Sequence, residues 1–347
     1  MNQISDAAHT VIAAQSQAAR VAVVIPSYRV IGTIADVIRG IGPEVERIYV
    51  VDDGCPDRSG DFVLRDNRDP RVRVLRNPVN QGVGGAVMRG YREAVAEGMD
   101  VIVKMDGDGQ MDARMLGRLV RPILDGRADY TKGNRFYDLS RIGRMPPLRL
   151  FGNSVLSFMA KFSTGYWGMF DPANGYTAIS GRVAAHLPMD KISRRYFFET
   201  DMLFRLNLLR AAVIDVPMHA IYGAESSHLK IGRIVPEFLA KHARNFVKRI
   251  FYNYFLRDLS LASLELVLGG AMLAFGMCFG VYHWMRAVLD GTPTALGIIM
   301  FAALPILIGL QLVLAFLAHD IASVPRTAIA RDLPEPAGVD SVRESEP

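Results

Sequence analysis

The segment MDGDGQMD places three aspartates within seven residues, directly after the apolar run of residues 101–105. Carboxylates this close together repel one another unless a cation shares the site or water surrounds them. Asp106, Asp108 and Gln110 alternate beyond the end of a predicted strand, and such oxygen donors suit Mg²⁺ or Mn²⁺ completed by phosphate oxygens. We therefore predict a divalent-cation site, with a solvated turn as the alternative. Asp112 is predicted to cap the helix that follows.

Three further polar or glycine-rich loops follow predicted strands: PSY at 26–28, DDG at 52–54 and NQG at 80–82. The apolar patterns predict strands over 21–26, 47–53, 71–77, 101–105 and 129–134, with helices from residue 31, over 84–97 and over 115–124. Apolar strands that alternate with helices predict a mostly parallel α/β sheet covered on both faces. Ligands bind beyond the carboxyl ends of such strands, so we expect all four loops to form one site.

Each of these loops offers groups suited to a nucleotide. Tyr28 can stack on a base, and Asp52 or Asp53 can accept a hydrogen bond from a base N–H. Glycines near Asn80 allow a close backbone approach to a diphosphate or ribose. Taken singly, each group is equally well explained by sheet packing, a turn or a helix cap.

The chain of 347 residues is half hydrophobic, with a mean hydropathy of +0.17, and the excess is concentrated near its end. Residues 259–285 and 295–318 are almost purely apolar, and each exceeds the roughly 20 residues that cross a bilayer. We predict two transmembrane helices, with buried core helices as the alternative. The remaining segments are predicted as a mobile arm (1–19), a catalytic domain (20–235), an amphipathic interface helix (236–258) and a disordered cytoplasmic tail (326–347).

The distribution of Lys and Arg predicts the orientation of these spans, because positive residues favour the cytoplasmic side. Five precede the first span, only Arg286 lies between the spans, and Arg326 and Arg331 follow the second. We therefore predict a multi-pass protein of the inner membrane with both termini cytoplasmic. A net charge of +5 suits an anionic membrane surface, and no nucleic-acid partner is expected. Cys55 and Cys278 predict no disulfide.

The motifs VAVVIPSY, VVDDG, NQGVGGA and MDGDGQMD, in this order, resemble family 2 glycosyltransferases of the GT-A (Rossmann-like) fold over about residues 20–230. With two C-terminal spans, the chain looks like the polyprenyl-phosphate branch, which includes dolichol-phosphate mannose synthase. The resemblance implies that Asp106, Asp108 and Gln110 hold the metal and diphosphate. It implies a nucleotide site of Pro26, Tyr28, Val51, Asp53, Asn80, Gly84, Asp106 and Gly107. Arg29 and Val30 replace the Asn-Glu pair common in the family, so the ribose contact must be replaced or lost.

The resemblance also implies an acceptor side. Arg135, Arg149 and Asn153 are expected to bind a lipid phosphate, since the guanidinium fork can bind two oxygens at once. His228 and Lys230, with Arg233, are expected on a loop that neutralises the leaving diphosphate. Asp201 stands where polymer-forming relatives keep a catalytic aspartate. Asp201 and Glu199 can equally cap a helix.

The activity implied is inverting transfer of a sugar from a UDP- or GDP-sugar to polyprenyl phosphate, dependent on Mg²⁺ or Mn²⁺, at the cytoplasmic membrane face. A processive polysaccharide synthase would normally have more spans and a Q-x-x-R-W motif, which this chain lacks. A non-catalytic scaffold that binds a nucleotide-sugar or a flippase is a further alternative. A downstream flippase is a possible partner of the enzyme as well. Gly276 and Gly280 form a GxxxG motif that indicates helix packing between protomers of a homo-oligomer, with a lipid-facing stretch as the alternative.

Overall fold

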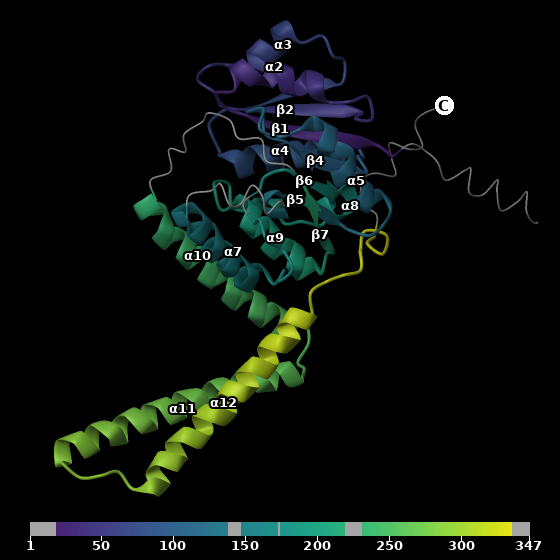
Figure 1. Cartoon of the computed structure of the whole chain (residues 1–347). Helices are drawn as coiled ribbons and strands as arrows, with labels where there is room; N and C mark the ends of the chain where they lie inside the picture. Colours follow the sequence, from purple (N-terminus) through teal and green to yellow (C-terminus); the bar gives the residue numbers. More distant parts are fainter. Residues whose placement is uncertain (1–18, 138–146, 173, 219–230, 335–347) are drawn as a thin grey trace, which may run out of the picture. The chain divides into compact units, whose positions relative to one another are not determined.

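The computed structural model describes residues 19–137, 147–172, 174–218 and 231–334. Two compact units make up the chain (Figure 1). The first comprises the residues up to His242 together with those from Pro325 onward, and the second comprises Ala243–Val324. The first carries the predicted catalytic loops, and the second carries both apolar helices.

A seven-stranded mixed sheet with strand order β3-β2-β1-β4-β6-β5-β7 forms the centre of the first unit. β1, β2, β3 and β4 run parallel, as do β5 and β7, whereas β6 runs antiparallel to both of its neighbours. The predicted parallel strands are confirmed, and the antiparallel β6 was not expected. The strands are β1 (Val21–Ser27), β2 (Arg47–Asp53), β3 (Val72–Asn77), β4 (Val101–Lys104), β5 (Tyr130–Asn134), β6 (Thr177–Ser180) and β7 (Val213–Pro217).

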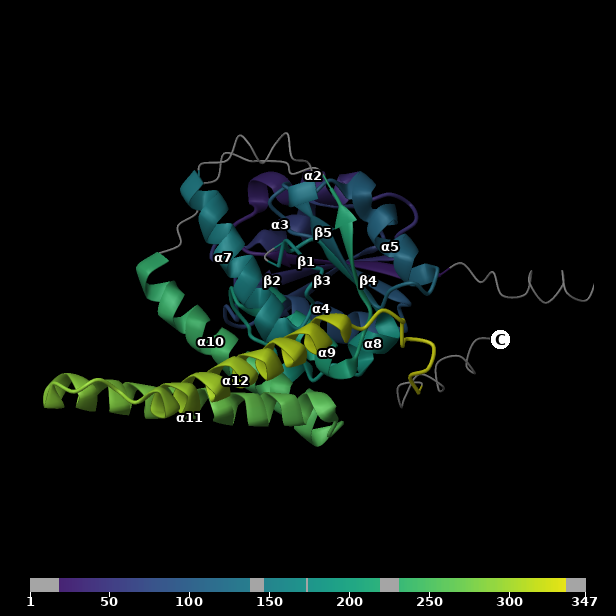
Figure 2. The ribbon, with the colours of Figure 1, turned by 60° about the horizontal axis from the view of Figure 1, so that its bottom comes forward.

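Helices surround this sheet, as Figure 2 shows from a second direction. The one between β2 and β3 was not predicted, because its sequence SGDFVLRD has few apolar residues. The α-helices are α2 (Ile31–Gly40), α3 (Ser59–Asp66), α4 (Val83–Ala96), α5 (Leu116–Leu124), α7 (Pro147–Thr164), α8 (Gly181–Ala185), α9 (Phe198–Leu209) and α10 (Ile231–Phe251). Short 3₁₀ turns are η1 (Ala113–Met115), η2 (Arg135–Tyr137) and η3 (Met189–Lys191).

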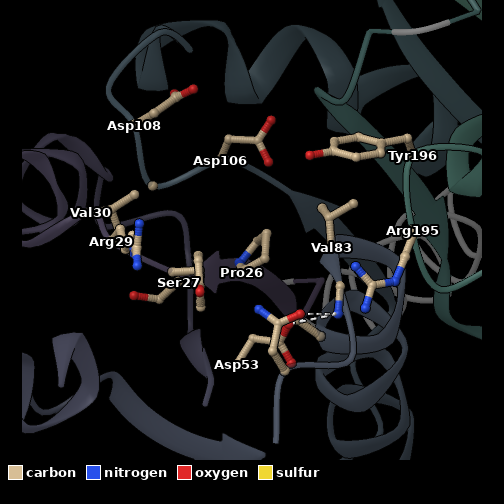
Figure 3. Close-up of a pocket in the computed structure, with 15 residues that line it drawn as sticks. Pro26, Ser27, Arg29, Val30, Asp53, Val83, Asp106, Asp108, Arg195 and Tyr196 are labelled. Carbon is tan, nitrogen blue, oxygen red and sulfur yellow. Dashed lines mark hydrogen bonds between the residues drawn. The ribbon is translucent and has the colours of Figure 1, made fainter. Parts of the chain in front are cut away.

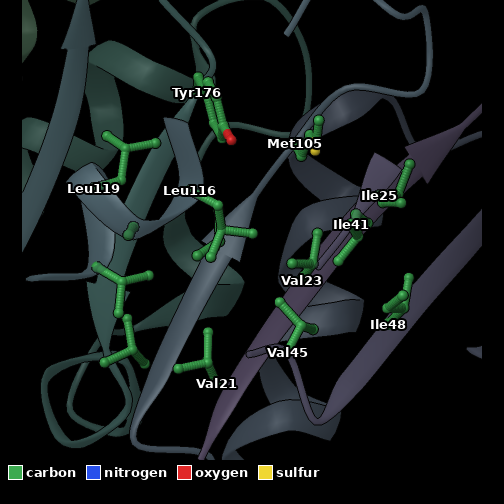
Figure 4. Close-up of a cluster of buried hydrophobic side chains, with 14 of the residues drawn as sticks. Val21, Val23, Ile25, Ile41, Val45, Ile48, Met105, Leu116, Leu119 and Tyr176 are labelled. Carbon is green, nitrogen blue, oxygen red and sulfur yellow. The ribbon is translucent and has the colours of Figure 1, made fainter. Parts of the chain in front are cut away.

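β1 is buried on both faces, which explains its unbroken apolar sequence. Val21, Val23 and Ile25 pack in one cluster with side chains of α2 and α5 (Figure 4). Val24 points the other way and packs against Gly90 of α4, where an added Cβ would overlap the valine. Burial of both faces therefore holds the carboxyl end of β1 rigidly in place, and with it the loop that follows.

The segment after the second apolar helix returns to the first unit. The backbone N–H groups of Ile329 and Ala330 donate to the carboxylate of Asp129 at 3.0 and 2.8 Å, and that of Ala212 donates at 2.7 Å. Asp129 is fully buried. Residues 326–334 are therefore tied to the sheet, which corrects their assignment to a disordered tail. Residues 335–347 and the arm 1–18 lie outside the described residues.

The second unit is a helical hairpin of α11 (Leu261–Asp290) and α12 (Leu296–Ala322). Both are long and apolar enough to cross a membrane, and only 11% and 6% of their most apolar windows are buried. A core helix of a soluble protein would be mostly buried instead. Before them, α10 ends in a π-helical turn at Tyr252–Leu256, within the segment predicted as an interface helix.

Glycines bring the two hairpin helices together. An added Cβ at Gly276 would lie 2.7 Å from Ile306 and 2.8 Å from the Ala302 carbonyl, and one at Gly280 would lie 3.3 Å from the Ala302 Cβ. The GxxxG motif therefore faces α12 of the same chain, and packing between protomers stays a prediction. At the base of the hairpin, the buried Arg249 and Asp320 form a two-point ion pair with N–O distances of 2.6 and 3.0 Å.

We expect Asp129→Ala to destabilise the first unit, because three backbone N–H groups lose their acceptor. Each buried donor left unsatisfied costs about 1–3 kcal/mol, so a loss on the order of 3 kcal/mol should lower the melting temperature by about 6–12 °C. The measurement is thermal unfolding of the full chain in detergent. Asp125→Ala is the control, since Asp125 makes only exposed ion pairs with Arg121 and Arg127. Equal melting temperatures for both variants would contradict a structural role of Asp129.

Candidate active site

An open pocket of about 850 Å³ lies beyond the carboxyl ends of β1, β2 and β4 (Figure 3). All four predicted loops contribute to its wall, together with two residues that precede α9. The lining residues are Pro26, Ser27, Tyr28, Arg29, Val30, Asp53, Asn80, Gly82, Val83, Ala86, Asp106, Gly107, Asp108, Arg195 and Tyr196. The structure thus brings together chemistry that is spread over 170 residues of sequence.

The loop after β1 presents an aromatic ring and a strained backbone to the pocket. Tyr28 is 42% exposed, which leaves surface for a stacked ligand. Arg29 has φ of +58°, and its N–H donates to the sulfur of Cys55 at 3.1 Å. Residues other than glycine rarely adopt positive φ, and those that do cluster at functional sites. Arg29 and Val30 both line the pocket.

The two aspartates after β2 have different roles. Asp52 accepts from the N–H groups of Cys55 and Gly60 at 2.8 and 2.7 Å and does not line the pocket. Asp53 does line it, and accepts from Asn77 Nδ2 and Gln81 N at Oδ1 and from Gly82 N at Oδ2. Asp52 therefore braces its own loop, whereas Asp53 shapes the NQG turn and also faces the pocket.

Not every residue of the predicted nucleotide site reaches the pocket wall. Val51 is fully buried within β2. Gly84 lies against the Ser193 carbonyl and the ring of Phe198, with no room for a Cβ. Asn80 and Gly82 do line the pocket, and Gly82 has φ of +85° at the start of α4. The NQG turn therefore contributes its first and last residues rather than the glycines inside the helix.

A buried lysine lies beneath the two aspartates that follow β4. Lys104 Nζ is 2.7 Å from Asp106 Oδ1 and 3.8 Å from Glu199 Oε1 of α9, and its side chain is only 2% exposed. Burial lowers the pKa of Lys104, but the attraction of Asp106 and Glu199 outweighs this and raises it above its ordinary value. The ammonium therefore stays charged and compensates the carboxylates.

The donor set at this point fits a divalent cation held jointly with a ligand. Asp106 and Asp108 line the pocket, and Gln110 N donates to Asp108 Oδ1 at 2.9 Å. Within the described part of the chain, no group of three or more His, Cys, Asp or Glu side chains could enclose a metal ion. Mg²⁺ is usually held by one or two carboxylates together with substrate phosphates, and two carboxylates at an open pocket match that pattern. Asp112 caps the start of the 3₁₀ turn η1, as predicted, because its side chain accepts a hydrogen bond from Arg114 N.

Only some of the residues predicted to bind the acceptor lie in the described part of the chain. Arg135 begins the 3₁₀ turn after β5, and its Nε and one Nη donate to Asp171 at 2.8 and 3.0 Å. Asn153 lies on α7, as does Arg149 by its backbone. The side chains of Arg149 and Arg233 and the residues His228 and Lys230 lie outside the described residues. A two-point pair with a buried carboxylate fixes the plane of the Arg135 guanidinium.

Two more buried ionisable groups lie near this end of the sheet. Lys132 of β5 is fully buried and donates to the Asn174 carbonyl. Burial lowers the pKa of Lys132 to about 8. Burial also raises the pKa of Asp215 of β7, although Phe170 N donates to its carboxylate. The ionisable side chains of Lys132, Asp171 and Asp215 therefore lie near one another where water screens their interactions little.

Asp201 is fully buried in the first turn of α9 and accepts from Ser193 N at 2.8 Å. It does not line the pocket. Its carboxylate instead anchors the loop 193–197, which carries Arg195 and Tyr196 into the pocket wall. Figure 3 shows the hydroxyl of Tyr196 directed toward Asp106 across the opening.

Comparison with known proteins agrees with this geometry. A family model described as glycosyl transferase family 2 matches residues 22–187. An undecaprenyl-phosphate mannosyltransferase from Micrococcus luteus is 30% identical over 230 residues, which cover 65% of this chain and 93% of the relative. A polyprenol monophosphomannose synthase from Mycolicibacterium smegmatis is 30% identical over 207 residues, which cover 57% of this chain and 76% of the relative.

The chain belongs to glycosyl transferase family 2. Its fold matches that of glucosyl-3-phosphoglycerate synthase from Mycobacterium tuberculosis, solved with Mn²⁺, UDP and its product. The TM-score is 0.52 at 21% identity, with 68% of this chain and 82% of that one covered. The predicted GT-A-like fold and glycosyltransferase activity are thereby confirmed.

Sequence reasoning missed three charged or aromatic residues in or beside this pocket: Lys104, Arg195 and Tyr196. Lys104 is visible as a charge at the end of an apolar strand, which is a signal of a buried pair. Arg195 and Tyr196 stand in the segment SRRYFF, where two adjacent arginines resemble ordinary surface cations. Their place in the pocket depends on Gly82, whose missing Cβ leaves room for the Arg194 carbonyl and the Arg195 side chain.

We expect the stability of the glycosyltransferase to rise from pH 8 to pH 9.5 through Lys132. Below pH 8 both the folded and unfolded states hold the proton on this lysine. Above pH 8 the folded state loses it while the unfolded state, with a pKa near 10.4, keeps it, so stability rises with pH. Over 1.5 pH units this amounts to about 2 kcal/mol. Melting temperatures of wild type minus Lys132→Met should increase over this range, and a flat difference would contradict a lowered pKa.

Proposed function

We propose that this glycosyltransferase moves a sugar from a nucleotide-sugar to the phosphate of a polyprenyl lipid. The observation that carries the proposal is an open pocket with Asp53 toward one end and Asp106 and Asp108 toward the other (Figure 3), in a chain that continues into two apolar helices. The two sequence relatives are named for undecaprenyl phosphate and for polyprenol monophosphomannose, and these names support the same acceptor class.

In this proposal the donor lies across the strand ends. The base rests by Pro26 and Tyr28 with Asp53 accepting one base N–H, and the diphosphate reaches toward Asp106 and Asp108. These two aspartates would hold the divalent cation, which when bound neutralises charge on the leaving diphosphate. Lys104 keeps Asp106 oriented, since it is paired with that carboxylate at 2.7 Å. The rigidity of β1, β2 and β4 supports a donor held in one pose.

The acceptor phosphate attacks C1 of the sugar from the face opposite the leaving group. The new bond joins a phosphate oxygen to C1, the bond from C1 to the diphosphate oxygen breaks, and the nucleoside diphosphate leaves with the electron pair. Configuration at C1 inverts. A phosphate monoester has a second pKa near 6, so it is ionised at neutral pH and needs no general base. The absence of a need for a general base fits the structure around Asp201, because this residue is buried and its carboxylate accepts a hydrogen bond from Ser193 N.

Arg135 is the proposed contact for the acceptor phosphate, with Arg149 and Asn153 on α7. Asp171 is 3% exposed and binds the Arg135 guanidinium at two points. A guanidinium already fixed in orientation loses less entropy when it binds a phosphate. Asp171 is therefore proposed to position Arg135 rather than to bind the substrate itself.

The two apolar helices are proposed to span the cytoplasmic membrane and bring the site to the lipid headgroup. The residues up to His242 and those from Pro325 onward belong to the same unit, which supports a hairpin that leaves and returns on one side. The basic residues that flank the hairpin support the cytoplasmic side. A lipid acceptor gives the hairpin a function, since its phosphate lies at the membrane surface.

Arg195 is proposed to bind a negatively charged part of the donor beside the start of α4. The stem of Arg195 packs at the position where a Cβ on Gly82 would lie, 2.9 Å from its Cγ, and the residue lines the pocket. Figure 3 shows its guanidinium on the side of Asp53 and Val83, beside the start of α4. A cation and a helix N-terminus at one place both favour a negatively charged ligand.

The proposal is tested by incubating membranes that contain the full chain with labelled nucleotide-sugars and Mg²⁺ or Mn²⁺. We expect label in a lipid that releases its sugar in mild acid. Asp108→Asn should reduce this transfer at least 100-fold, because the cation loses a carboxylate. Asp112→Asn is the matched control and should stay within a few-fold of wild type, since Asp112 caps η1. Label in a polymer or protein without labelled lipid would overturn the acceptor assignment.

A second prediction separates the two arginines before α9. We expect Arg195→Gln to raise the KM for the nucleotide-sugar and to lower kcat/KM by about 10–100-fold, which corresponds to a lost charged contact of about 1.5–3 kcal/mol. Arg194→Gln should leave both constants within about twofold, because Arg194 is exposed and does not line the pocket. If both variants behaved alike, the assignment of Arg195 to the donor site would be wrong.

A further inference from the structure

We infer that His242 of α10 is a positioning residue for the donor pocket, and that it holds Arg195 and Tyr196 in place through the ring of Phe197. The inference rests on the proposed function and deepens it, because it names the support of one part of the pocket wall. That part is the segment of residues 193–197, called the wall loop below. The wall loop and the residues that support it all lie in the first unit.

The wall loop carries its two pocket residues on an exposed stretch. Arg195 and Tyr196 both line the pocket, and Tyr196 is 64% exposed. Before them, the loop is held by hydrogen bonds of the Ser193 N–H and the Arg194 carbonyl. Directly after them comes Phe197, which is 1% exposed and is the buried side chain of the loop. The position of Tyr196 in the wall therefore depends on how Phe197 is packed.

Helix α10 supplies the contacts that fix Phe197. The His242 ring packs edge-on against the Phe197 ring, with centroids 4.9 Å apart and planes at 86°. Phe238, one turn earlier on α10, makes a second edge-on contact with centroids 5.4 Å apart. The Lys241 ammonium lies 5.6 Å from the centre of the same ring. Edge-to-face pairs and cations near a ring are both favourable, so three side chains of one helix hold Phe197.

His242 is itself held by helix α7. It is 3% exposed, and its Nδ1 lies 2.8 Å from Ser163 Oγ. Ser163 Oγ donates to the Ala160 carbonyl at 3.2 Å, and a hydroxyl has one proton to donate, so it accepts from Nδ1–H. Nε2 is buried and has no hydrogen-bond partner among the described residues. The orientation of the imidazole therefore depends on its bond to Ser163.

His242 acts by packing rather than by charge. Burial lowers its pKa to about 4, so the ring is neutral at neutral pH. It joins the wall of the donor pocket to α7, the helix that carries the proposed acceptor contact Asn153. Loss of this support should displace Arg195 and Tyr196 without disturbing Asp106 on the loop after β4. We therefore expect weaker donor binding with an unchanged chemical step.

The first test compares two buried phenylalanines in the transfer assay with the full chain in membranes. We expect Phe197→Leu to raise the KM for the nucleotide-sugar on the order of tenfold while kcat stays within about twofold, which is the signature of lost binding. Phe204→Leu is the matched control, since Phe204 of α9 is 0% exposed and does not line the pocket. It should lower the melting temperature as Phe197→Leu does, but leave KM within about twofold of wild type. Equal KM values for the two variants would overturn the inference and leave the proposed function intact, whereas no transfer by the wild type would overturn the proposed function.

The second test leaves the wall loop unchanged and so does not depend on the folding of Phe197→Leu. His242→Leu and Ser163→Ala should each raise the same KM severalfold, because each frees the Phe197 ring. Ser157→Ala is the control, since Ser157 Oγ of the same helix donates to the Phe170 carbonyl. A double variant of Phe197→Leu and His242→Leu should be no weaker than the weaker single variant, because both remove one contact. Effects that multiply, or a lower kcat at unchanged KM, would show that His242 does not act through Phe197.

Discussion

The buried ammonium of Lys104 is the point at which three separate segments of the catalytic unit meet. It ends β4, pairs with Asp106 on the loop that follows, and lies 3.8 Å from Glu199 of α9. At Gly175, before β6, an added Cβ would overlap this ammonium. A buried charge without partners is costly, so these segments must assemble together or not at all. The position of Asp106 in the pocket wall therefore depends on the pairing of its carboxylate with the buried Lys104.

Elsewhere in the first unit, buried carboxylates accept hydrogen bonds from backbone N–H groups and thereby hold loops in place. Asp52 holds the turn after β2, Asp53 holds the start of α4, Asp129 holds the returning segment near Ile329, and Asp201 holds the loop before α9. Such bonds are stronger than neutral ones. They keep the active-site loops in place before any ligand arrives, which supports catalysis by positioning.

Family membership and fold are common to enzymes with different donors and acceptors, so the chemistry of this chain must be sought in its own residues. Residues 29 and 30 bring no acid to the pocket wall, since Arg29 and Val30 line it, and the backbone of Arg29 has a positive φ. Arg195 adds a second cation from a loop distant in sequence. The hairpin is stabilised separately, by glycine-mediated helix packing and by the pair of Arg249 and Asp320.

The sequence by itself determined the features whose signals are local. Apolar runs identified the parallel strands and the two long apolar helices, and the residues just after each strand identified the four site loops, because parallel strands end at one edge. Tertiary structure alone decided the antiparallel β6, the place of Arg195 and Tyr196, the face of the GxxxG motif and the return of residues 326–334. Each of these depends on contacts between residues far apart in the chain. A pattern within one segment carries no information about the partner that will bury it, so only the assembled fold could reveal them.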